Sequence, residues 1–123
     1  MKEKIFVNLT FVNLTPHDIN IYDSNNNLVA TIPRSGKVAR VTMEQKTVGY
    51  IDVNGHKIPV KKTIYGEIEN LPDPQPNTIY IVSLLVLQAL GGTRDDVLAP
   101  DTGAGAVRDD QGRIIGTRNF IKL

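Results

Sequence analysis

Alternating apolar and polar residues predict β-strands through the first half of the chain. Ile19 and Ile21 alternate with polar neighbours, residues 28–32 continue the period of two, and Val38–Met43 alternates again. Turn-forming residues separate these runs, most densely at Asp23–Asn27. The pattern therefore predicts short strands joined by tight turns.

A β-hairpin is the clearest local signal. Within Ile51–Ile58, the dipeptide Asn54-Gly55 can adopt the two positive φ angles of a type I′ turn. A two-residue turn at this place would set Val53 opposite His56 and Ile51 opposite Ile58. We therefore expect a hairpin with both isoleucines on one face.

The second half begins with a run typical of a buried central strand, Thr78–Val82. Apolar residues occupy both its odd and its even positions, so both faces of the strand would be buried. Ser83 is a suitable N-cap for a short helix over 84–90, and Gly91-Gly92 can supply its left-handed end. A short strand at Val97–Ala99 and a closing hairpin over Val107–Phe120 complete the prediction.

Three prolines between Leu71 and Asn77 exclude a strand interior or a helix there. We take residues 71–77 as the join between a sheet part at about 12–70 and a helix and C-terminal ligand region at 78–123. The fold class expected is α+β in a single domain: an antiparallel N-terminal sheet, one principal helix and a C-terminal hairpin.

The pentapeptide Phe-Val-Asn-Leu-Thr occurs twice in succession, at 6–10 and at 11–15. A five-residue repeat reverses the face of a strand with each copy, so both copies cannot present the same side inward. We expect one copy to enter the sheet and the other to form an arm or an edge; a tandem duplication without any role explains the repeat equally well.

Composition excludes several classes of protein. The 123 residues carry 14 basic and 13 acidic side chains, a net charge of +1, which provides no general footprint for duplex nucleic acid or an anionic membrane. The absence of cysteine removes disulfides and thiolate chemistry. No signal peptide pattern opens the chain, and the apolar stretch at 79–90 is too short to span a bilayer. We expect a soluble cytosolic protein.

The sequence shows no strong catalytic motif. His17 and His56 lack the spacing of a metal site, and no Gly-x-Ser-x-Gly elbow is present. Asp101-Thr102-Gly103 matches the short signature of aspartic proteases, but an Asx turn in a glycine-rich loop explains it better. We therefore expect no enzyme, no metal and no cofactor.

Arginines gather in the last third of the chain. Arg94-Asp95-Asp96 and Arg108-Asp109-Asp110 flank the small-residue loop 101–106, and the planar guanidinium suits phosphate and adenine. Pairing of each arginine with its neighbouring aspartate is the competing explanation. Ser83 adds a donor at a helix start, where its plain capping role competes with anion binding. These residues indicate an anionic small-molecule ligand.

Several segments in this order resemble a family of phage proteins, the Thoeris anti-defence sponges. The resemblance runs from about Val12 to the end and rests on the following segments: 12–17 (VNLTPH), 33–41 (PRSGKVARV), 65–67 (YGE), 71–72 (LP), 78–83 (TIYIVS), 94–101 (RDDVLAPD), 107–109 (VRD) and 112–116 (GRIIG).

The resemblance implies a phage anti-defence protein in the cytoplasm of the infected bacterium. Such a protein sequesters the cyclic ADP-ribose isomers that bacterial TIR enzymes make, without degrading them. Some members also bind cyclic oligonucleotides at separate sites. The family forms homo-oligomers, dimers that associate into hexamers, with pockets at subunit interfaces. A non-enzymatic virion or assembly protein that binds only other proteins is the alternative. A binding pocket requires Arg94 and Arg108 to converge on one cavity, whereas in a structural protein these two arginines can point separately into solvent.

Roles for individual residues follow from the resemblance. Arg108 and Arg94 are the candidates for the pyrophosphate, Asp95 and Asp101 for ribose hydroxyls, and Arg40 would reach in from a neighbouring strand. An aromatic shelf for a base would have to come from Tyr65, Tyr80 or Phe120. Tyr80, in the predicted central strand, is expected in the core instead.

Overall fold

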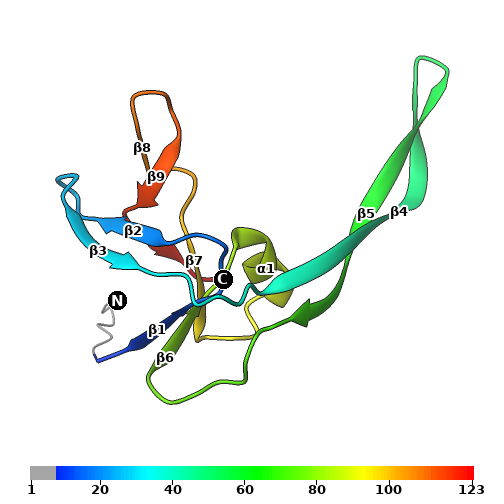
Figure 1. Cartoon of the computed structure of the whole chain (residues 1–123). Coiled ribbons are helices and arrows are strands. Elements are labelled where there is room, and N and C mark those ends of the chain that lie inside the picture. Colours follow the sequence, from blue (N-terminus) through cyan, green and yellow to red (C-terminus); the bar gives the residue numbers. More distant parts are fainter. Residues whose placement is uncertain (1–7) are drawn as a thin grey trace, which may run out of the picture.

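Two four-stranded sheets and one short helix form the body of the molecule, and a long two-stranded arm extends away from it (Figure 1). The computed structural model describes residues 8–123. Phe6 and Val7 of the first pentapeptide copy lie outside the described residues.

The first sheet has the order β1-β6-β7-β10. Its strands are β1 (Thr10–Asn13), β6 (Thr78–Ile81), β7 (Val97–Pro100) and β10 (Phe120–Ile121). β6 runs parallel to both of its neighbours, and β10 is antiparallel to β7. The buried central strand expected near residue 80 is confirmed, because Tyr80 and Ile81 are at most 2% exposed. The second pentapeptide copy supplies most of β1.

The second sheet has the order β3-β2-β9-β8. It contains β2 (Ile19–Tyr22), β3 (Leu28–Ile32), β8 (Ala106–Arg108) and β9 (Ile114–Thr117). β2 and β3 form an antiparallel hairpin, as do β8 and β9, and the two hairpins join through a parallel contact between Ile21 and Thr117. Both hairpins lie where the alternating pattern predicts them.

The helix α1 (Leu84–Leu90) follows β6 directly and packs on the first sheet. Ser83 caps its start and Gly91, at φ 62°, ends it, as the sequence predicts. The core consists of apolar side chains from β6, β7, α1 and the segments that follow β1 and precede β4: Leu14, Ala39, Tyr80, Val82, Val86, Leu87, Val97 and Ala99.

The arm consists of β4 (Arg40–Val53) and β5 (His56–Glu69), paired antiparallel over their whole length. The predicted register at its tip is confirmed, with Val53 opposite His56 and Ile51 opposite Ile58. The strand expected at Val38–Met43 begins at Arg40 and continues into this hairpin, with register irregularities between Val41 and Met43 and between Thr47 and Gly49. At the base of the arm Val41 and Ile68 pack against the core, and the arm extends from there away from the body that residues 8–123 form (Figure 1).

The expected α+β fold class is wrong. Of the described residues, 51% lie in strands and 6% in the one short helix, and the three sheets mix parallel and antiparallel pairs. The expected N-terminal antiparallel sheet is also wrong, because β1 pairs with β6 and β2 pairs with β9, across the proline-rich join. Hydrophobic alternation indicates which segments are strands, but pairing depends on long-range burial that a local pattern does not carry.

Candidate functional site

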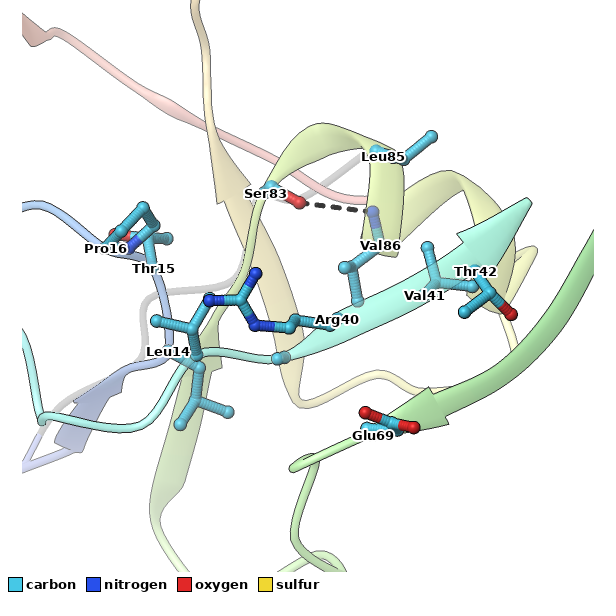
Figure 2. Close-up of a pocket in the computed structure, with 12 residues that line it drawn as sticks. Leu14, Thr15, Pro16, Arg40, Val41, Thr42, Glu69, Ser83, Leu85 and Val86 are labelled. Atoms are coloured by element: carbon cyan, nitrogen blue, oxygen red, sulfur yellow. Dashed lines mark hydrogen bonds between the residues drawn. The ribbon is translucent and has the colours of Figure 1, made fainter.

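Two adjoining cavities lie where the body, the start of α1 and the base of the arm meet. We call the first the Arg40 cavity; its volume is about 420 Å³, and Figure 2 shows its lining. The second, the Asp101 cavity, measures about 600 Å³ and lies between the two sheets. Thr15, Pro16 and Ser83 line both cavities and form the ridge between them.

The ridge is held in place by the buried side chain of Asn13, which is 1% exposed. Its Nδ2 donates to the carbonyl oxygens of His17, at 2.8 Å, and Ile32, at 3.0 Å. Its Oδ1 accepts from the backbone N–H of Thr15 at 3.0 Å and from the Thr15 hydroxyl at 2.7 Å. One side chain thereby ties β1, the Thr15–His17 turn and the end of β3 together. No local pattern in the sequence distinguishes Asn13 for this role from Asn8, which has the same neighbours.

Arg40 begins β4 and gives the first cavity its positive charge. Figure 2 shows its side chain leaving the strand toward Leu14 and away from Glu69, its register partner on β5. Among residues 8–123 no carboxylate lies within salt-bridge distance of Arg40. The surrounding walls are mainly apolar and include Leu14, Val41 and Leu85. An exposed guanidinium beside apolar walls offers donors for an anion and a surface for a base.

Ser83 lies between the cavities and confirms its predicted capping role. Its backbone is extended, with φ −66° and ψ 157°, and its Oγ accepts from the backbone N–H of Val86 at 3.4 Å (Figure 2). The hydroxyl proton takes no part in this bond. Ser83 can therefore donate to a ligand in either cavity.

Asp101 lines the second cavity, at the end of β7. Its carboxylate accepts from the backbone N–H groups of Gly103 at 2.8 Å and Gly105 at 3.0 Å, which confirms the Asx turn expected for Asp101-Thr102-Gly103. The bond from Gly103, helped by the Asn119 side chain and Gly105, holds the pKa of Asp101 below its ordinary value. The group is therefore ionised at neutral pH and can accept hydrogen bonds from hydroxyl groups.

The other three predicted site residues lie away from both cavities. Arg94 binds Asp96 with two bonds of 2.8 Å, donates to the carbonyl of Pro72 at 3.0 Å, and lies 6.0 Å from the Tyr80 ring centroid. It thus ties the proline-rich segment to the first sheet. Asp95 pairs with Lys122 at 3.0 Å.

Arg108 is exposed on the β8–β9 hairpin and donates to the carbonyl of Gly112 at 2.7 Å. Neither Arg94 nor Arg108 lines any of the described cavities. The structure therefore brings together Arg40, Ser83 and Asp101, and it does not bring the two predicted pyrophosphate arginines to a shared cavity of one chain.

The two histidines lie in different parts of the structure: His17 lines the Asp101 cavity, and His56 lies at the tip of the arm. Within the part of the chain that the structure describes, no three metal-ligating side chains come together. Over the same residues, no helix has the length and apolar character needed to cross a bilayer.

The Arg94–Asp96 pair predicts a pH-dependent stability. Hydrogen bonding to Arg94 lowers the pKa of Asp96 below 3.8, and both side chains are 19% exposed. The stabilisation is complete above the unfolded carboxyl pKa and is lost as the pH falls through the lower folded value. Asp96→Asn should therefore destabilise the protein at about pH 6, and the difference from wild type should shrink by about pH 2.5.

Urea unfolding at a series of pH values measures this difference. Asp95→Asn is the matched control, because Asp95 is 89% exposed in its pair with Lys122, and exposed pairs contribute little. An Asp96→Asn effect that is constant across the pH range would contradict the prediction.

No known protein family, no curated protein and no solved structure is significantly similar to this chain.

Proposed function

We propose that this protein binds a cyclic ADP-ribose-type nucleotide in the two adjoining cavities and sequesters it intact. It would act as a phage anti-defence protein in the cytoplasm of an infected bacterium and block Thoeris immunity. The observation that carries the proposal is the exposed Arg40 guanidinium, without a carboxylate partner among the described residues, in a cavity that meets a second one at Ser83.

The chemistry of the cavities suits the parts of such a nucleotide. A pyrophosphate is recognised by a guanidinium, here Arg40, with the Ser83 hydroxyl as a further donor. Ribose hydroxyls can donate to the ionised Asp101 in the adjoining cavity. Both volumes lie in the range of ligand sites, about 300–1,000 Å³, and the apolar walls can cover a base.

The proposal differs from the family resemblance in the residue that carries the pyrophosphate. The resemblance assigns that role to Arg94 and Arg108. Arg94 is already bound by Asp96 and Pro72, and Arg108 lies on an exposed hairpin. Their predicted roles require a site shared with a neighbouring chain, whereas Arg40 already lines a cavity of its own chain.

Ligand capture from a lysate tests the proposal. The purified protein is incubated with a lysate that contains TIR-made cyclic ADP-ribose, washed and heat-denatured, and the supernatant is analysed by liquid chromatography and mass spectrometry. An intact species of ADP-ribose mass should be recovered, and Arg40→Ala should weaken its binding about 10- to 100-fold, because a charge-assisted bond is lost. In a parallel incubation the protein is offered cyclic dinucleotides in place of the lysate.

Arg113→Ala is the matched control, since Arg113 is 72% exposed, pairs with Asp109 and lies outside the cavities. Arg108→Ala tests whether Arg40 or Arg108 binds the pyrophosphate. This variant should reduce the amount of nucleotide recovered only if Arg108 has the role that the family resemblance gives it. Ligand left unchanged in the flow-through would overturn the sponge proposal. Recovery of a cleaved product would show an enzyme instead.

A second candidate function is a non-enzymatic phage virion or assembly protein, and two observations favour it. The first is that Arg94 and Arg108 do not converge on one cavity of the described chain, as expected for a protein that binds only other proteins. The second is the surface of the β4–β5 arm. The arm exposes many large apolar side chains to solvent, among them Val48, Tyr50 and Ile51, which are 57–65% exposed. Surfaces of this kind commonly contact other proteins. Self-association without any captured nucleotide would support this second function over the first.

A further inference from the structure

The Asp101 cavity differs in charge from the Arg40 cavity beside it. Two carboxylates line the Asp101 cavity, those of Asp18 and Asp101, and none of its described lining residues is an arginine or a lysine. The Arg40 cavity has the guanidinium of Arg40, which points away from the one carboxylate in that lining, Glu69 (Figure 2). A nucleotide bound across the ridge would therefore meet positive charge on one side and negative charge on the other.

Asp18 keeps a free acceptor although it is held by Arg34. Its Oδ1 accepts from the backbone N–H of Arg34 at 2.9 Å and from the Nε of the same residue at 3.0 Å. The backbone bond, helped by the side-chain bond, lowers the pKa of Asp18 below its ordinary value. No donor among residues 8–123 is hydrogen-bonded to Oδ2. This oxygen can therefore accept from a hydroxyl group of a ligand in the cavity.

The two carboxylates come from different sheets and line one space. Asp101 directly follows β7 of the first sheet, and Asp18 directly precedes β2 of the second. A sphere with the volume of this cavity, about 600 Å³, is about 10 Å across, close to the screening length of about 8 Å at physiological ionic strength. A charged group bound inside the cavity is therefore exposed to the field of both carboxylates.

We infer that Asp18 and Asp101 make the site specific for a nucleotide with an unphosphorylated ribose and exclude the same nucleotide when its ribose carries a 2′-phosphate. The inference rests on the proposed function, because it concerns the ligand of the same two cavities. A ribose hydroxyl group donates to a carboxylate, whereas a phosphate ester carries a charge of about −1.5 to −2 at pH 7 and is repelled. In dinucleotide-binding proteins an acidic residue likewise binds the ribose 2′-hydroxyl, and an arginine accommodates the 2′-phosphate.

Arg34 is a cation beside Asp18, and its donors are partly in use. Its Nε binds Asp18, and its Nη1 donates to the carbonyl of Pro16 at 3.3 Å. Its side chain is 58% exposed and is not part of the lining of the Asp101 cavity. Arg34 therefore offsets only part of the charge of Asp18, and we expect the two carboxylates to weaken binding of the phosphorylated nucleotide about 10- to 100-fold. His17 lines the same cavity, so a measurement at pH 8 limits any charge on its imidazole.

Isothermal titration calorimetry at pH 8 tests the inference with two probes, cyclic ADP-ribose and cyclic ADP-ribose 2′-phosphate. The wild-type chain should bind the unphosphorylated probe about 10- to 100-fold more tightly. Asp18→Asn and Asp101→Asn, each made alone, should reduce this ratio of affinities about 3- to 10-fold, because each removes one negative charge. Asparagine keeps the size of the side chain and one carbonyl acceptor, so the local turns can be retained.

Asp23→Asn is the matched control and should keep the wild-type ratio. Asp23 accepts from the backbone N–H groups of Asn25 and Asn27, both at 2.9 Å, as Asp101 does from two glycines, and it lines neither cavity. Equal or tighter wild-type binding of the 2′-phosphate, or an unchanged ratio in either carboxylate variant that is folded by circular dichroism, would overturn the inference and leave the proposed function standing. Failure of both probes to bind the wild-type chain would overturn both.

Discussion

Asn13→Ala should lower the free energy of unfolding by about 2–4 kcal/mol. The Asn13 side chain is 1% exposed, and its amide meets the carbonyls of His17 and Ile32 while its oxygen accepts two bonds from Thr15. Alanine removes all of these bonds and leaves buried polar groups without partners. Urea unfolding followed by circular dichroism measures the loss.

Asn8 provides an unusual control, because it occupies the same place in the first copy of the pentapeptide. It is exposed and has φ 56°, so glycine can replace it without backbone strain. Asn8→Gly should change the free energy of unfolding by less than about 0.5 kcal/mol. Equal effects at the two positions would show that the Asn13 bonds do not stabilise the ridge between the cavities.

Tyr80→Ala should cost about 3–5 kcal/mol, the range for removing a large aromatic side chain from a core. Tyr80 lies on the central strand β6 and is 2% exposed. Its ring packs within the core, its hydroxyl donates to the carbonyl of Asp73 at 3.2 Å, and Arg94 lies over the ring. Thermal and urea unfolding of the variant give the size of the loss.

Tyr80→Phe separates the contribution of the ring to stability from that of the hydroxyl group. Phenylalanine keeps the packing and loses the bond to Asp73, so we expect a cost of about 1 kcal/mol. If Tyr80→Ala reduced nucleotide capture without reducing stability, Tyr80 would be an aromatic shelf for a base and its placement in the core would be wrong.

Local features of the fold could be predicted because a few neighbouring residues determine them. Asn54-Gly55 imposes a tight turn, and this tight turn sets Ile51 opposite Ile58. Ser83 begins α1 because its side chain accepts from the backbone N–H of Val86, and Gly91 ends it because a residue without a Cβ adopts the left-handed conformation without strain. Asp101 forms its Asx turn with the next few residues of the same loop.

The candidate site was predictable only in part. Ser83 and Asp101 do line cavities, and Arg40 does come from a strand. Pairing of Arg94 with a neighbouring aspartate, the competing explanation, is what the structure shows for Asp96, whereas the bond from Arg94 to the Pro72 carbonyl could not be predicted from the sequence. Whether an arginine faces a ligand or a neighbouring carboxylate depends on groups brought close by the fold. The prediction that Arg94 and Arg108 act together rests on the two Arg-Asp-Asp runs that flank one loop and on the family resemblance, and neither carries that information.

The two pentapeptide copies separate these contributions most clearly. By itself the sequence determined the strand-forming segments, the hairpin turn and the helix ends, because backbone preferences act over a few residues. Identical residues nevertheless ended in different places: Asn13 is buried among four hydrogen bonds, and Asn8 is exposed. Only the tertiary structure decided this, together with the pairing of β1 with β6 and of β2 with β9, because each depends on which distant surfaces are buried against one another.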